Sequence, residues 1–212
     1  MEQILRKSME AIRPLDVDAM EAARKRQMAL AKPPGSLGRL EDLSVQLAGI
    51  TGQVHNTVSR QHLLVFAADN GVVEEGVSSA PQSVTLMQTV NLTRAKTGAS
   101  VLAKHFGCGI TVCDVGVNAV IKEPAVLNRK IAFGTQNMTK GPAMIRQQAV
   151  QAILTGLELA KETPADVLGI GEMGIGNTTT SSAVLSVLLN VEPEKVTGRG
   201  GGVTDEGFRK KK

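Results

Sequence analysis

Aromatic residues are scarce in this 212-residue sequence: they make up 2% of the chain, and Trp and Tyr are absent. Proteins that hold single-stranded nucleic acid usually stack its bases on aromatic side chains. The formal net charge is +4, but most basic residues are scattered beside acidic ones, and only Arg209-Lys210-Lys211-Lys212 forms a basic run. We therefore expect no nucleic-acid partner.

Long apolar runs and cysteine clusters are also missing. No segment approaches the roughly 20 apolar residues that span a bilayer, and the first residues do not have the pattern of a signal peptide. We expect a cytoplasmic protein with no membrane partner. The two cysteines, Cys108 and Cys113, are too few for a disulfide framework, and no His or Cys residues have metal-ligand spacing. We expect no metal site.

Short apolar segments alternate with helical patterns through most of the chain. Residues 62–68, 110–115 and 166–170 have the composition of strands buried on both faces. Helices are predicted between them, at residues 82–94, 99–106 and 142–162. This alternation predicts an α/β fold, a three-layer Rossmann-like parallel sheet flanked by helices.

The two ends of the chain differ from this pattern. The first 31 residues look helical and end at Lys32-Pro33-Pro34-Gly35, after which a second helix is predicted to begin near Leu37. We divide the chain into an N-terminal helical segment, residues 1–50, and an α/β domain, residues 51–212. At the other end, a polar helix starting at Thr204 or Asp205 has no terminating signal. We expect the C-terminal part of the domain to be missing.

The segment DVLGIGEMGIGNTTT, residues 166–180, runs from a strand pattern through four glycines and Glu172 into the start of a helix. Glycines let a backbone approach a ligand closely, and a helix N-terminus favours an anion. The partial GxGxxG match is weak, because no acidic residue follows about 20 positions later. From these residues alone, a phosphate loop and a structural turn are equally supported. If the loop holds a phosphate, Glu172 reaches a hydroxyl, a ring N–H or a cation instead.

Two other positions have both a functional and an ordinary interpretation. Asp69 and Asn70 follow the strand at residues 62–68, where ligands bind in α/β sheets, but Asx residues before glycine also form turns. Gln88 lies on the helix at residues 82–94 and is either a site residue or a solvated amide.

Three segments together carry a specific resemblance. KPPGSLGRLEDLSVQLAGI at residues 32–50, FAADNGVVEEGVSSAPQSVT at residues 66–85 and GIGEMGIGNTTTSSA at residues 169–183 closely resemble the nicotinate-nucleotide:dimethylbenzimidazole phosphoribosyltransferase family. The resemblance extends from about Pro14 to Lys211. It implies that residues 1–50 form part of a small helical domain and that residues 51–212 form a truncated nucleotide-binding domain.

The resemblance also implies an activity. That family transfers the phosphoribosyl group of nicotinate mononucleotide to 5,6-dimethylbenzimidazole, giving α-ribazole 5'-phosphate and nicotinate for the lower ligand of cobalamin. No cofactor is implied, and a homodimer is expected. The implied substrate-binding residues are Asp69, Gln88, Glu172, Gly174, Gly176, Asn177, Thr178, Thr179 and Lys211. Among them, Gln88 lines the benzimidazole pocket, Lys211 binds the nucleotide, and Glu172 contacts the sugar or the incoming base.

The sequence departs from the family in two respects. Asn70 stands where many members have His, so no imidazole role is assigned there. The family's general base is a glutamate beyond residue 212, so no catalytic residue is named, although Glu172 is an alternative. Two other hypotheses therefore stay open: an inactive nucleotide- or benzimidazole-binding module that needs a C-terminal partner, and a non-enzymatic scaffold.

Overall fold

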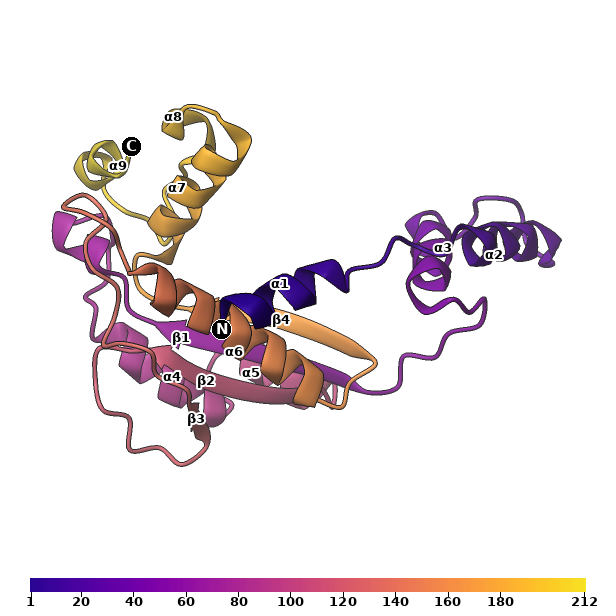
Figure 1. Ribbon diagram of the computed structural model, residues 1–212, viewed down its shortest axis with the longest axis horizontal. Coiled ribbons are helices and arrows are strands. Elements are labelled where there is room, and N and C mark those ends of the chain that lie inside the picture. The colour runs from indigo at the N-terminus through magenta and orange to yellow at the C-terminus, as the bar shows by residue number, and fades with distance from the viewer. The chain divides into compact units, whose positions relative to one another are not determined.

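The computed structural model describes residues 1–212. It divides into two compact units, residues 3–59 and residues 1–2 with 60–212, and Figure 1 shows the elements of each. We call them the helical unit and the sheet unit.

The first 31 residues form two helices, α1 (Glu2–Glu10) and α2 (Val17–Ala29). The expectation of one helical stretch is therefore wrong over residues 11–16. Pro14 cannot donate a helical hydrogen bond and disfavours a helical conformation for the residue before it. Asp16 then begins α2, because its carboxylate accepts the N–H of Ala19 at 2.9 Å.

Helix α3 (Arg39–Thr51) packs against α2. Their small core consists of Ala19, Ala23, Val45 and Ala48. Gly49 permits a close approach, since an added methyl group there would lie 2.7 Å from Cγ of Met20. A hydrogen bond of 2.7 Å from Gln27 Nε2 to Ser44 Oγ also joins the two helices.

The sheet unit contains four strands in the order β3-β2-β1-β4, and every pair is parallel. The three predicted strands are present, as β1 (Gln61–Ala68), β2 (Gly109–Gly116) and β4 (Val167–Met173). The short strand β3 (Val126–Asn128) was not predicted. The predicted helices are also present, as α4 (Val84–Thr93), α5 (Gly98–His105) and α6 (Arg146–Glu162).

Helices cover both faces of this sheet (Figure 1). On one face Leu64 and Cys113 pack against Leu159 of α6. On the other face Val65 and Val112 pack against Leu92 of α4. Leu64 and Val65 are adjacent in β1 and so point to opposite faces. The predicted three-layer arrangement is confirmed.

The remaining elements are helical: the 3-10 helix η1 (Gly71–Glu75), α7 (Asn177–Leu189), α8 (Pro193–Val196) and α9 (Asp205–Lys211). Thr204 caps α9 by accepting the N–H of Gly207 at 3.2 Å. None of the helices combines the length and the apolar character that a membrane span requires.

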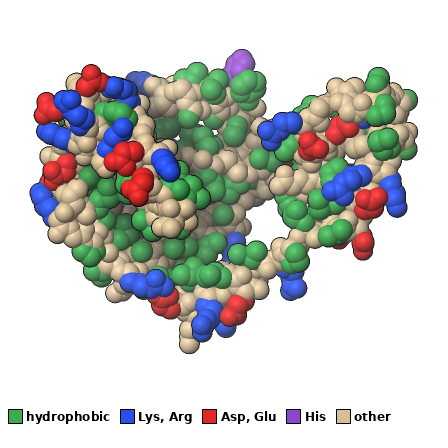
Figure 2. Space-filling view, turned by 90° about the horizontal axis from the view of Figure 1, so that it is seen from above, with side chains coloured by type: hydrophobic (Ala, Val, Ile, Leu, Met, Phe, Trp, Pro, Cys, Tyr) green, Lys and Arg blue, Asp and Glu red, His purple; other side chains and the backbone are tan.

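Apolar side chains are exposed along strand β4 and helix α7. Ile170 is 77% exposed, and Val187 and Leu188 on α7 are 80% and 76% exposed. Figure 2 shows hydrophobic side chains spread over a broad area of the sheet unit. Exposed apolar area of this extent marks a surface suited to contact with other polypeptide.

Candidate nucleotide site

The sheet topology places two loops in one crevice. From β1 the chain continues to β2 and β3 on one side, and then returns through α6 to β4 on the other side of β1. In parallel sheets, ligands bind where the strand order reverses in this way, beyond the carboxyl ends of the strands. Asp69 and Asn70 follow β1, and residues 174–176 follow β4. The two segments flank that crevice.

The turn after β4 is formed by fewer glycines than predicted. Gly169 lies inside β4, within the predicted strand, and Gly171, expected beyond the strand end, lies inside it too; they pair with Leu63 and Val65 of β1. The turn uses Gly174 and Gly176. Gly176 has a φ of +85°, which an L-residue rarely adopts. An added methyl group at Gly174 would collide with the carbonyl oxygen of Ala68.

Lys211 is the cation of this site. It is only 7% exposed, and its Nζ donates a hydrogen bond of 2.6 Å to Oγ1 of Thr178 in the first turn of α7. It forms no salt bridge. Burial lowers the pKa of the Lys211 ammonium. A buried cation without a carboxylate partner, beside the positive end of a helix, is costly unless an anion joins it.

Three further polar side chains, those of Glu172, Asn177 and Thr179, lie at the end of β4 and the start of α7. Asn177 Nδ2 donates to Oε2 of Glu172. Glu172 is exposed to solvent. Surrounding protein atoms raise the pKa of its carboxyl, and the hydrogen bond from Asn177 opposes the rise. The hydroxyl of Thr179 is buried and has no hydrogen-bond partner.

A largely apolar cavity of about 730 Å³ lies between α4 and the end of β4. Its polar lining residues are Gln88, Lys96, Thr97 and Glu172, and its apolar lining includes Leu63, Val65 and Met173. Few polar groups in an otherwise apolar cavity are typical of a small-molecule site. The structure thus places Gln88 in the same cavity as Glu172 of β4, whose carboxylate accepts a hydrogen bond from Asn177 at the start of α7.

The carboxylate of Asp69 contacts the loop after β2 rather than the loop after β4. Its Oδ2 accepts the N–H of Asn118, in the loop after β2, at 2.7 Å. Its Oδ1 is buried and has no partner. Its backbone N–H donates to the carbonyl of Gly116 at 2.9 Å, and its carbonyl accepts from Thr135 at 3.0 Å. Asp69 therefore connects neighbouring loops and makes no hydrogen bond with the loop after β4.

Two residues that contact the loop after β4 were not among the predicted site residues. Thr85 accepts the N–H of Ile175 at 3.0 Å, and Asn70 donates to the carbonyl of Ile175 at 3.1 Å. The sequence suggests Asn70 only as a turn former or a ligand-orienting residue. Thr85 has no distinguishing signal, because a threonine in a helix is unremarkable until its distant partner is known.

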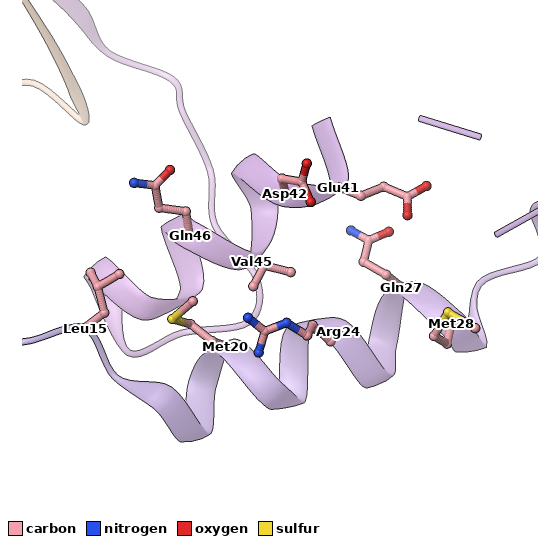
Figure 3. A pocket seen from close by; sticks show the side chains of 9 residues that line it. All are labelled: Leu15, Met20, Arg24, Gln27, Met28, Glu41, Asp42, Val45 and Gln46. Carbon is pink, nitrogen blue, oxygen red and sulfur yellow. The ribbon is translucent and has the colours of Figure 1, made fainter. Parts of the chain in front are cut away.

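A second cavity, of about 570 Å³, lies between α2 and α3 in the helical unit. Figure 3 shows Met20, Val45 and Arg24 between the two helices. Two of its polar side chains are engaged locally: Glu41 pairs with Lys32 at 2.6 Å, and Nε2 of Gln27 donates to Ser44. No cluster of His, Cys, Asp or Glu side chains suited to a metal ion occurs in residues 1–212.

Known proteins are similar to this chain in sequence and in fold. The chain is 44% identical over 99% of its length to the nicotinate-nucleotide–dimethylbenzimidazole phosphoribosyltransferase of Clostridium tetani, and covers 59% of that protein. It is 49% identical to the protein of the same name from Alkaliphilus metalliredigens, and covers 60% of it. The chain thus spans about 60% of the length of these relatives.

Solved structures agree. The crystal structure of CobT from Thermus thermophilus superposes with a TM-score of 0.87 at 41% identity, over 92% of this chain and 60% of that one. A family model described as "Phosphoribosyltransferase" matches residues 12–212. The resemblance predicted from the three sequence segments is confirmed: the chain belongs to the phosphoribosyltransferase family that includes these relatives.

Proposed function

We propose that this chain forms the nucleotide-binding part of an enzyme that transfers the phosphoribosyl group of nicotinate mononucleotide to 5,6-dimethylbenzimidazole, in cobalamin assembly. The observation that carries the proposal is the buried ammonium of Lys211, held beside Thr178 with no carboxylate partner. A phosphate would supply the balancing negative charge, and charge-assisted hydrogen bonds to it are strong. Relatives with the corresponding name support the choice of substrates.

In this proposal the loop after β4 holds the ribose phosphate. Gly174 and Gly176 let the backbone approach the ligand, and Asn177, Thr178 and Thr179 surround the phosphate and ribose from the N-terminus of α7. The unpaired hydroxyl of Thr179 is a free hydrogen-bonding group for this purpose. Asp69 acts by holding the loops on the β2 side of the crevice.

The apolar cavity beside Gln88 accepts the flat benzimidazole. A ring nitrogen of the base attacks C1' of the ribose while the bond from C1' to the pyridinium nitrogen breaks, and that electron pair returns to nicotinate. The leaving group is a neutral ring nitrogen, so it needs no proton. The incoming base must lose its ring proton, and we assign no acceptor for it among residues 1–212. Orientation of the two rings is the contribution of these residues.

The same proposal includes a homodimer located in the cytoplasm. The exposed apolar side chains of β4 and α7 supply surface for contact with further polypeptide, such as a second subunit.

Calorimetry and a product assay test the function together. Nicotinate mononucleotide and 5,6-dimethylbenzimidazole are each titrated into the 212-residue chain, and nicotinate release is followed with both present. Binding of both with release supports the transferase. Binding without release assigns this chain to the binding module instead. Absence of binding, with no ligand-dependent rise in melting temperature, contradicts the proposal and favours the hypothesis of a non-enzymatic scaffold.

A further inference from the structure

Ile175 lies in the loop after β4, and side chains from two other elements hold both polar groups of its backbone. Its N–H donates to Oγ1 of Thr85, in the first turn of α4, at 3.0 Å across 90 positions. Its carbonyl accepts from Nδ2 of Asn70, after β1, at 3.1 Å across 105 positions. The peptide is therefore held from both sides.

Asn70 also contacts the helix that follows the loop. Its Oδ1 lies 3.3 Å from the hydroxyl of Thr180, in the first turn of α7, and that hydroxyl also lies 2.9 Å from the carbonyl oxygen of Asn177. One amide side chain thus joins the loop and the start of α7 to the end of β1.

Packing leaves this arrangement little freedom. Thr85 is 0% exposed and Asn70 is 8% exposed. A methyl group added at Gly174 would lie 2.9 Å from Nδ2 of Asn70, so the loop backbone passes directly over that side chain. Buried polar groups that lose such a partner are left unsatisfied, which costs more than the bond itself contributes.

We propose that Asn70 and Thr85 are positioning residues of the nucleotide site. They hold the Ile175 peptide, and with it the first turn of α7, in the orientation that presents Thr178 and the helix amides to a phosphate. The proposal rests on the proposed function. Neither residue needs to touch the ligand. A loop that is already ordered binds more tightly, because binding then has no ordering cost.

Helix α4 offers a matched set of variants. Thr85→Val keeps the shape of the side chain and removes the acceptor for Ile175, whereas Thr85→Ser keeps the hydroxyl. The control is Thr89→Val. Thr89 is also 0% exposed on α4, but its hydroxyl donates to the carbonyl of Thr85 within the helix, at 2.7 Å, and has no bond to the loop.

Two measurements on the 212-residue chain test the proposal. Amide hydrogen exchange by NMR reports the protection of the Ile175 N–H without any ligand. Calorimetry reports the dissociation constants of nicotinate mononucleotide and inorganic phosphate. In Thr85→Val we expect faster exchange at Ile175 and a dissociation constant about tenfold higher, the equivalent of one hydrogen bond. Thr85→Ser and Thr89→Val should both stay near the unaltered chain. Asn70→Ala removes the side chain that holds the Ile175 carbonyl, so this variant should also weaken binding.

The outcomes separate this inference from the proposed function. Equal exchange rates of the Ile175 N–H in Thr85→Val and Thr89→Val overturn the positioning role, whatever dissociation constants are measured. Faster exchange with unchanged affinity also overturns it, because the loop order would then not matter for binding. If the unaltered chain binds neither probe, the proposed function fails, and the exchange rates alone decide whether the two side chains hold the loop.

Discussion

Lys211 donates a 2.6 Å hydrogen bond to Thr178, joining the last turn of α9 to the first turn of α7 across 33 positions of sequence. The bond places a buried ammonium at the N-terminus of α7, so a positive side chain lies beside the positive end of the helix dipole. This unfavourable arrangement is the clearest physical sign of an anion-binding site, and it yields the first prediction.

Lys211→Met should weaken the binding of nicotinate mononucleotide by roughly tenfold to a hundredfold, because a hydrogen bond to a charged group is lost. Nicotinate ribonucleoside, which lacks the phosphate, should bind both proteins equally. Without ligand, the variant should be at least as stable as the unaltered chain, since it no longer buries an unpaired cation. Calorimetry and thermal unfolding provide these values.

The control for that variant is Lys210→Met. Lys210 is exposed on the same helix and pairs with Glu206 at 3.2 Å. Its removal should leave the dissociation constant unchanged. Equal affinities in the two variants would show that the buried ammonium does not bind the phosphate.

Gln88→Ala should weaken the binding of 5,6-dimethylbenzimidazole by roughly threefold to tenfold, the value of one hydrogen bond. The affinity for nicotinate mononucleotide should not change, because Gln88 lines the cavity rather than the helix N-terminus. Met87→Ala is the control, since Met87 is 55% exposed and does not line the cavity. A loss confined to the nucleotide would contradict the assignment of this cavity to the base.

Gly176→Ala should destabilise the sheet unit by about 1–2 kcal/mol, because an L-residue is strained at the left-handed φ of this position. Crowding adds to the strain: the new methyl group would lie 2.6 Å from Cγ2 of Val73. Urea denaturation measures the change. Gly98→Ala, where an added methyl group meets no atom within 4 Å, should be neutral or stabilising. Similar losses in both variants would mean that the loop geometry is not responsible.

Glu172→Gln should raise the melting temperature at pH 7 and have a smaller effect at pH 4. Burial raises the pKa of folded Glu172 above its usual value of 4.5. Between pH 4.5 and the pKa of the folded state, the folded protein keeps a proton on Glu172 that the unfolded chain has lost. The stability of the fold therefore falls as the pH rises through the folded pKa. Glutamine cannot ionise and avoids this loss.

Glu158→Gln is the control for that pH dependence, because Glu158 is exposed on α6. The two glutamine variants are compared at pH 4 and at pH 7, and the greater stabilisation by Glu172→Gln should appear at pH 7. If the two variants had the same effect at both values, burial of the Glu172 carboxyl would not contribute to stability.

Much of the fold could be predicted because its elements have strong local patterns. Strand β1 and helix α6 were expected from apolar runs and helical periodicity, and both are present within a few residues of their predicted bounds. The end of β4 was missed because glycines favour turns locally. Pairing of Gly171 with Val65 of β1 overrides that preference and extends the strand. The break near Pro14 was missed because the prediction relied on apolar positions from Val17 onwards and extended the helical stretch over the first 31 residues.

Most strands and helices along the chain follow from the sequence alone, because periodicity is a local property of the chain. The family, and most chemical groups available to the site, follow from the resemblance carried by three sequence segments. Which of these groups meet depends on the tertiary structure. Parallel pairing of β1 with β4 brings Asn70 to Ile175, the packing of α4 brings Thr85 to the same peptide, and α9 returns Lys211 to Thr178. These contacts join residues between 33 and 105 positions apart, and the partner of each side chain is set by how the strands pair and the helices pack, which no local pattern specifies.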